Sequence, residues 1–175
     1  AGAIDRSRII FVTGGLGPTP DDLTRELTAE LLGLELIEDA GVMMDIARRF
    51  RSSGVEMRSS NQRQAMVPEG AELLDNSNGT APGLYLSTGA SASQVHIFLL
   101  PGPPRELYPI FEEQVVPRIK SFLSEEGLAV PACRNYFFMG LGESELSGRV
   151  ESVLNGMPGT FEIGYCLKAG GVIVR

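Results

Sequence analysis

The amino-acid sequence predicts an α/β protein whose first unit contains a largely parallel or mixed sheet. Short apolar runs typical of buried strands alternate with helical patterns along the chain, and this alternation is what gives α/β folds. Three of the runs end in a glycine turn that opens a helix, at residues 14–22, 102–106 and 140–144. The composition agrees, because 43% of the 175 residues are hydrophobic and 21% are charged, as in ordinary globular proteins.

The chain opens with a predicted strand at residues 9–12, Ile-Ile-Phe-Val, which runs into the first glycine turn. A helix is expected to follow at once, because Thr19 is suited to cap it and Asp22 lies three residues later, as in a capping box. The buried face of this helix is expected to carry Leu23, Leu27 and Leu31, which repeat at four-residue spacing.

The next segments predict a second helix and a loop. Apolar residues recur at helical spacing over residues 39–51, until Ser-Ser-Gly at 52–54 ends the pattern. A short strand is expected at residues 72–74. The polar, glycine-containing stretch at residues 76–83 then reads as a loop.

Residues 83–87 and 94–100 predict a hairpin, because two apolar runs flank a polar turn. The only histidine, His96, falls in the second of these strands, which argues against a Ser-His or Cys-His nucleophile. After Gly102 a helix is expected that Pro117 kinks or ends.

A second, smaller unit is expected to begin where the periodicity lapses, around residues 127–133. It reads as a strand at residues 136–139 and a helix at 143–154, followed by a hairpin of residues 161–167 and 172–174 that turns at two glycines.

The charge balance limits the classes of partner. Lys and Arg number 15 against 22 Asp and Glu, a formal charge of -7, which is the wrong sign for direct binding to nucleic acid or to an anionic membrane. No apolar run approaches the ~18 residues of a membrane span, and residues 1–8 do not resemble a secretory signal. We therefore expect a cytoplasmic protein that holds any anionic ligand locally.

The glycine turns are the first candidate site. A strand that ends in a glycine turn before a helix presents unpaired backbone N–H groups at the carboxyl edge of the sheet, where anions bind. The first turn is neither a Walker loop nor a Rossmann fingerprint, since no Gly-Lys-Ser/Thr follows and the glycine spacing differs. The pattern predicts a phosphate-bearing ligand.

Three acidic residues next to these turns have two interpretations each. Asp21 and Asp22 would repel a phosphate unless a divalent cation lies between them, so they indicate a metal-bridged phosphate. Alternatively, both carboxylates complement the helix dipole and Asp22 completes the capping box. Glu106 could likewise reach a metal, or serve as a favourable first-turn acid of its helix, which we favour.

The polar loop offers further donors. Asn76, Asn78, Gly79 and Thr80 could bind a sugar or a phosphate, or form a solvated turn in which Gly79 has a positive φ. Arg63 is a possible partner for an anion, although a single arginine is more often on a solvated face.

In this order, the segments resemble the amino-terminal region of the competence/damage-inducible CinA family, whose first domain belongs to the MoaB/MogA molybdopterin-binding superfamily. Residues 13–24, Thr-Gly-Gly-Leu-Gly-Pro-Thr-Pro-Asp-Asp-Leu-Thr, are similar to the family signature. Further matching motifs stand at residues 61–65, 68–71, 78–83, 100–106, 140–146 and 163–165, so the similarity covers essentially the whole chain.

The resemblance implies a three-layer sandwich with a mostly parallel sheet over residues 1–128, MoaB/MogA-like but lacking the strand and helix with which family members begin. It implies an incomplete, small KH-like α/β unit over residues 129–175. Relatives are commonly dimers or trimers, so a homo-oligomer is expected.

For function, the resemblance implies a metal-dependent pyrophosphatase that hydrolyses ADP-ribose to AMP and ribose 5-phosphate. Asp22 matches the functional aspartate of the superfamily, with Asp21 beside it, and a divalent ion (Mg, Mn or Co) is expected near Asp22 and Glu106. The implied phosphate-binding residues are Thr13, Gly14, Gly15, Gly17, Asn78, Gly79, Thr80, Gly102 and Pro103.

Two alternatives stay open. The shared signature also suits a protein that binds or adenylylates molybdopterin, although Leu16, the Pro-Pro form of the second loop and the second unit look more like CinA than MogA. A non-catalytic regulatory domain that binds nucleotide is the other alternative.

Overall fold

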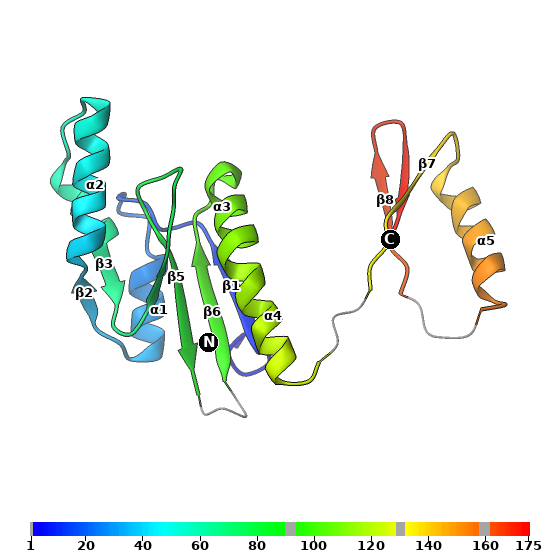
Figure 1. The fold of residues 1–175 in the computed structure, drawn as a ribbon, viewed down its shortest axis with the longest axis horizontal. Coiled ribbons are helices and arrows are strands. Elements are labelled where there is room, and N and C mark those ends of the chain that lie inside the picture. The colour runs from blue at the N-terminus through cyan, green and yellow to red at the C-terminus, as the bar shows by residue number, and fades with distance from the viewer. Residues whose placement is uncertain (1, 90–93, 129–131, 158–161) are drawn as a thin grey trace. The chain divides into compact units, whose positions relative to one another are not determined.

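The computed structural model describes residues 2–89, 94–128, 132–157 and 162–175. The chain divides into two compact units, Ala1–Glu126 and Gly127–Arg175 (Figure 1). This division lies two residues before the boundary expected after residue 128.

The first unit contains a four-stranded sheet in the order β1-β6-β5-β4. β1 (Ile9–Thr13) runs parallel to β6 (Val95–Leu100), whereas β5 (Gly83–Thr88) is antiparallel both to β6 and to β4 (Glu72–Leu74). The α/β class is confirmed, but the expectation of a mostly parallel sheet is wrong. The reason is connectivity: β5 and β6 form the predicted hairpin, and a short loop at residues 75–82 joins β4 to β5, so both pairs are antiparallel.

Both faces of this sheet are covered, which gives three layers. Successive residues of β6 point to opposite faces: Phe98 and Leu100 belong to the core under the helices of one face, while Ile97 and Leu99 belong to the core of the other. Every residue of β6 is buried, as expected for a strand enclosed on two sides.

One face is covered by a continuous helical rod (Figure 1). It consists of α3 (Pro104–Ile110), a π-helical segment (Phe111–Val115) and α4 (Val116–Glu125). Pro117 does not end the rod. It lies in the first turn of α4, where a missing N–H is tolerated, and the regular hydrogen-bond pattern changes just before it.

The first helix differs from its prediction. α1 spans Thr24–Leu32, so it begins four residues later than expected, and its N-cap residue makes no side-chain cap. The leucines expected on the buried face, Leu23, Leu27 and Leu31, are 42%, 58% and 49% exposed. Arg25 and Ala29 are buried instead, because Arg25 forms hydrogen bonds to the loop before the helix and so turns that face inward.

The second helix, α2 (Ala40–Ser53), is confirmed, and the carboxylate of Asp39 caps it by accepting the N–H of Val42 at 2.9 Å. Two short antiparallel strands that were not predicted, β2 (Leu36–Glu38) and β3 (Met66–Pro68), flank it in the sequence. A 3-10 helix, η1 (Ser59–Ala65), precedes β3 and packs against α2 through Ala65.

The second unit has a three-stranded antiparallel sheet in the order β7-β9-β8. It contains β7 (Tyr136–Met139), α5 (Glu143–Leu154), β8 (Tyr165–Lys168) and β9 (Gly171–Val174). Leu146 of α5 packs on Val172 and Val174. The predicted hairpin is confirmed, but the expected start of its first strand at residue 161 lies outside the described residues. Within the described ranges, no helix is long and apolar enough to cross a membrane.

His96 lies in the predicted strand and is only 6% exposed. Its Nδ1 lies 2.8 Å from the Tyr85 hydroxyl, and its ring stacks on Phe122 at 3.8 Å. Burial holds the pKa of His96 below its usual range, with a smaller contribution from the Arg8 cation. The folded protein therefore resists protonation of His96, whereas the unfolded chain takes up the proton near pH 6.5.

The lower pKa of His96 in the folded state predicts that the protein loses stability at acid pH. Because the unfolded state binds more protons below about pH 6.5, the Tm is expected to fall as the pH is lowered from about 7.5 to 5.5. In His96→Gln this decrease should be smaller. Thermal denaturation followed by circular dichroism at three pH values measures it, and an equal slope in both proteins would assign the acid sensitivity to other groups.

Candidate functional site

The first glycine loop follows directly after Thr13, the last residue of β1. Gly14 and Gly15 have φ values of +85° and +70°, which favour glycine. The N–H of Gly14 donates to the carbonyl of Leu100 at 2.9 Å, and the Thr24 hydroxyl donates to the carbonyl of Gly14 at 2.8 Å. The loop is therefore fixed between the end of β6 and the start of α1.

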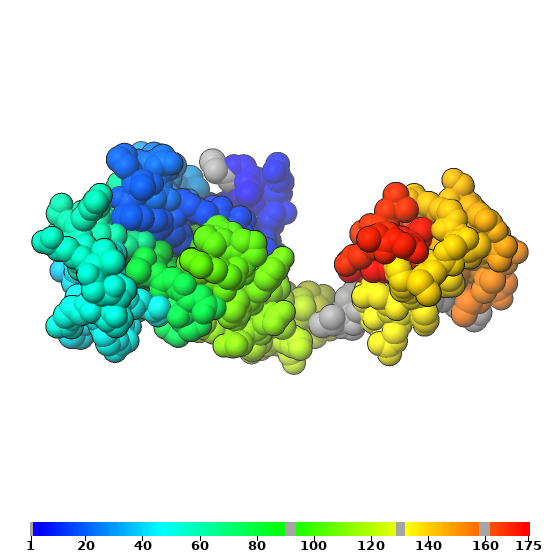
Figure 2. All heavy atoms as spheres, turned by 90° about the horizontal axis from the view of Figure 1, so that it is seen from above, coloured from blue at the N-terminus to red at the C-terminus, as the bar shows by residue number. Residues whose placement is uncertain are grey.

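The second glycine loop lies against the first. A Cβ atom on Gly102 would come within 3.4 Å of the Cα of Gly14. In Figure 2 the blue amino-terminal segment and the green segment that includes α3 are neighbours on one surface of the first unit. The two loops meet where the parallel strands β1 and β6 end, with Pro103 as the N-cap residue of α3. The third turn predicted at 140–144 belongs to the second unit.

Asp22 lies at the end of the first loop and is ionised. Its Oδ2 accepts the Thr19 hydroxyl at 2.5 Å and the Thr19 N–H at 2.9 Å, and these hydrogen bonds lower the pKa of Asp22 even though partial burial opposes them. The expected capping box is wrong, because α1 begins only at Thr24. The same hydrogen bonds close a turn, in which the Asp22 N–H donates to the Thr19 carbonyl at 3.0 Å.

Asp21 is exposed, and its carboxylate has no hydrogen-bond partner among the described residues. The two neighbouring acids thus differ: Asp22 is held in place by the loop, and Asp21 faces solvent.

Two consecutive residues of η1 connect the first loop to the polar loop. Arg63 donates to the carbonyl of Thr19 at 3.0 Å and pairs with Glu26 at 2.8 Å. The Gln64 amide donates to the Thr80 hydroxyl at 3.0 Å. Arg63 therefore supports the first loop, a role that neither of its sequence interpretations included. The Thr80 hydroxyl accepts from Gln64 and keeps its own proton to donate.

Glu106 supports the polar loop. Its Oε2 accepts the Asn76 amide at 2.9 Å, and its side chain is only 13% exposed. A Cβ on Gly79 would lie 1.9 Å from this oxygen, so glycine is required there by close approach. The expectation of a positive φ at Gly79 is wrong. Asn78 is also engaged, since its amide donates to the Arg105 carbonyl at 2.9 Å.

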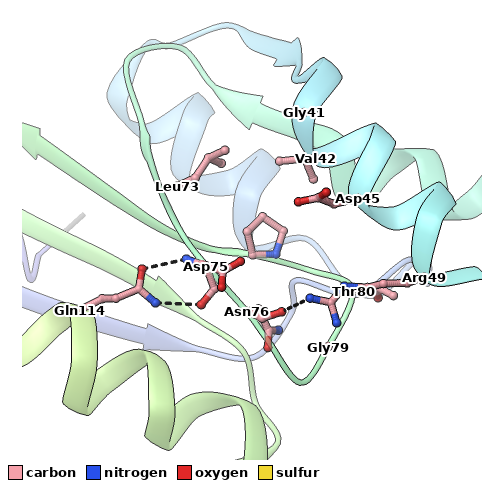
Figure 3. A pocket seen from close by; sticks show the side chains of 11 residues that line it. Gly41, Val42, Asp45, Arg49, Leu73, Asp75, Asn76, Gly79, Thr80 and Gln114 are labelled. Carbon is pink, nitrogen blue, oxygen red and sulfur yellow. Dashed lines mark hydrogen bonds between the residues drawn. The ribbon is translucent and has the colours of Figure 1, made fainter. Parts of the chain in front are cut away.

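A cavity of about 320 Å³ lies between α2 and the polar loop (Figure 3). Arg49 of α2 anchors that loop by donating to the carbonyls of Asn76 and Ser77 at 2.6 and 3.0 Å. Gln114 binds both backbone groups of Asp75 at 2.8 Å. The lining residues are Gly41, Val42, Asp45, Arg49, Leu73, Asp75, Asn76, Gly79, Thr80, Pro82 and Gln114.

Sequence reasoning missed most of this lining. Asp45 and Arg49 lie on α2, where charged residues at helical spacing read as a solvated face. No local signal shows that the polar loop returns to this helix, so only the fold places them together.

The acidic residues fit a metal only in part. No group of three or more His, Cys, Asp or Glu side chains is close enough to hold a metal among the described residues. Glu106 is directed to Asn76. Mg²⁺, however, is commonly bound by one or two carboxylates together with substrate phosphates. Of the three acids, Asp22 is the one that the first loop holds in place through hydrogen bonds.

The chain has relatives of known sequence. A CinA-like protein of Akkermansia muciniphila is 41% identical over 170 residues, which are 97% of this chain and 40% of that protein. A CinA-like protein of Nostoc punctiforme is 42% identical over 152 residues, 87% of this chain and 35% of that protein. The resemblance to CinA is confirmed, and the chain spans about two fifths of the length of these relatives.

A solved structure and a family model agree with these relatives. The crystal structure of the protein CinA from Thermoplasma acidophilum, whose function is unknown, matches with a TM-score of 0.55 at 26% identity, over 73% of this chain and 67% of that one. The model of a family described as "probable molybdopterin binding domain" matches residues 1–121. The chain thus belongs to this molybdopterin-binding domain family, of the type related to CinA-like proteins.

Proposed function

We propose that the first unit binds a nucleotide or pterin phosphate at its two glycine loops and hydrolyses the diphosphate of ADP-ribose to AMP and ribose 5-phosphate. The observation that carries this proposal is the meeting of the loops beside the ionised carboxylate of Asp22. The N–H of Gly15 has no partner among the described residues, and Gly15 is not fully buried, so this N–H is available to an anion.

The loop supplies what this reaction needs. Water attacks a phosphorus atom, and negative charge grows on the phosphoryl oxygens, which the amides of the first loop stabilise. Asp22 would hold a divalent cation that enters with the diphosphate and neutralises its charge. Because Thr19 fixes Asp22, the carboxylate keeps its position before the ligand binds.

The cavity beside Thr80 suits the hydroxyl groups of a sugar. Asp45 and Asp75 line it, and carboxylates there disfavour phosphate but accept hydrogen bonds from hydroxyl groups, as acids do from ribose. Asp75→Asn is therefore expected to raise the KM for ADP-ribose about threefold to tenfold with little change in kcat. Steady-state kinetics measures this, and an unchanged KM would remove the cavity from the substrate site.

The first experiment is to measure AMP release from ADP-ribose with and without Mg²⁺, Mn²⁺ or Co²⁺. Metal-dependent release supports the hydrolase. Binding of ADP-ribose without release would leave a nucleotide-binding regulatory domain.

A second candidate is molybdopterin binding, which the matching family model favours. Calorimetric titration with both ligands separates the two candidates. Tighter binding of molybdopterin, without hydrolysis of ADP-ribose, would replace the pyrophosphatase proposal.

A further inference from the structure

Arg25 is a charged residue in the core of the first unit. It is 2% exposed, although Leu27 and Leu31 of the same helix face solvent. Its guanidinium donates to the carbonyl of Leu16 at 2.5 Å and to the carbonyl of Gly17 at 3.1 Å. The side chain therefore lies directly beneath the first glycine loop and holds two consecutive carbonyl groups of it.

The guanidinium of Arg25 forms no ion pair with any described residue, although the carboxylates of Glu26 and Asp22 act on its charge from a greater distance. Among the described residues, no carboxylate lies within 4.0 Å of its guanidinium, and the carboxylate of the neighbouring Glu26 pairs with Arg63 instead. The Nε of Arg25 is buried without a hydrogen-bond partner. Burial lowers the pKa of Arg25, yet an arginine stays charged in proteins. A buried, unpaired cation is costly unless another charge compensates it.

The bonds to Arg25 also set which way the loop amides point. In a trans peptide the C=O and the following N–H point in opposite directions. Because the Leu16 carbonyl faces Arg25, the N–H of Gly17 faces away from the core, toward the carboxylate of Asp22. The Asp22 carboxylate lies close to the backbone of Gly17, since a Cβ on Gly17 would lie 2.4 Å from the Asp22 Oδ2.

From these contacts, we infer that Arg25 is a positioning residue of the anion site: it orients the Leu16–Gly17 peptide and supplies a buried positive charge that a bound phosphate neutralises. This inference rests on the proposed phosphate site in the first loop. It explains why an arginine, and not an apolar residue, occupies the core face of α1. It also gives an acidic protein a local positive charge where an anion must bind.

The test measures binding of inorganic pyrophosphate in the presence of Mg²⁺ by isothermal titration calorimetry, which needs no catalysis. Arg25→Met removes the charge and both hydrogen bonds, and we expect its affinity to fall about tenfold or more. Arg25→Lys keeps the charge but not the two-pronged contact, so a smaller loss is expected. Arg118→Met is the control, because it removes one positive charge from an arginine that binds Glu72 and Gln114 away from the loop.

The outcomes separate the inference from the proposed function. The inference is overturned if both Arg25 variants bind pyrophosphate as tightly as the wild-type protein and Arg118→Met do. In that case Arg25 only stabilises the fold. If the wild-type protein does not bind pyrophosphate, the phosphate site itself is wrong. The Tm of each variant shows whether it is folded. If Arg25→Met does not fold, the affinity of Arg25→Lys for pyrophosphate decides whether Arg25 contributes to the anion site.

Discussion

Asp22→Asn is expected to lower kcat/KM for the hydrolysis of ADP-ribose by about 100-fold or more, with the fold retained. Asparagine has the same shape as aspartate and can still accept a hydrogen bond from Thr19, so the turn at residues 19–22 should persist. What is lost is the negative charge that Thr19 keeps in place beside the loop. The measurement is AMP release at saturating Mg²⁺, together with the Tm of each protein.

Asp21→Asn is the matched control for this variant. Both substitutions remove one negative charge from adjacent positions, but Asp21 is exposed and the loop does not hold it. A loss of less than about fivefold is therefore expected, as for the removal of a screened surface charge. Equal losses in the two variants would show that total charge near the loop matters and that Asp22 has no specific role. Full turnover by Asp22→Asn would exclude it from the reaction.

The sequence predicted the elements that local patterns define. The strand predicted at residues 9–12, the hairpin of β5 and β6, and the helix predicted over residues 39–51 all depend on residues near in sequence, and the structure has them. The strand-turn-helix pattern also predicted two glycine loops at one sheet edge, where the contact of Gly14 with Gly102 places them.

What the sequence did not reveal depends on contacts between distant segments. The four-residue repeat of Leu23, Leu27 and Leu31 is the pattern of a buried helix face, but the hydrogen bonds of Arg25 to the preceding loop decide which face turns inward. Thr19 and Asp22 have capping-box spacing, and their side chains do bond, yet the chain forms a turn there and not a helix. Local spacing thus identified which residues interact but not the structure they form.

Glu106 is a similar case. As a first-turn acid beside a glycine loop it had two sequence interpretations, a metal ligand or a complement to the helix dipole. Its hydrogen bond to Asn76 crosses 30 residues of sequence, and no local pattern predicts such a contact.

Gly79→Ala is expected to destabilise the first unit by about 2 kcal/mol, in the range typical of overpacking. The new Cβ would lie 1.9 Å from the Oε2 and 2.4 Å from the Cδ of Glu106, and 2.7 Å from the Asn76 amide nitrogen. The Glu106 side chain is mostly buried, so it cannot swing away without losing its bond to Asn76. Either that bond breaks or the polar loop shifts. Urea denaturation monitored by circular dichroism measures the change in free energy of unfolding.

A double-mutant cycle shows whether this contact is the cause. Glu106→Ala removes the atoms that the new methyl group would meet, so Gly79→Ala should cost much less in the Glu106→Ala background than in the wild-type protein. If the cost is the same in both backgrounds, the penalty comes from the backbone at residue 79 and not from Glu106. A coupling of about 1 kcal/mol or more would instead establish Glu106 as the support of the polar loop. Because Thr80 and the cavity depend on the position of that loop, Gly79→Ala should also weaken the binding of ADP-ribose, whereas it leaves the Asp22 turn untouched.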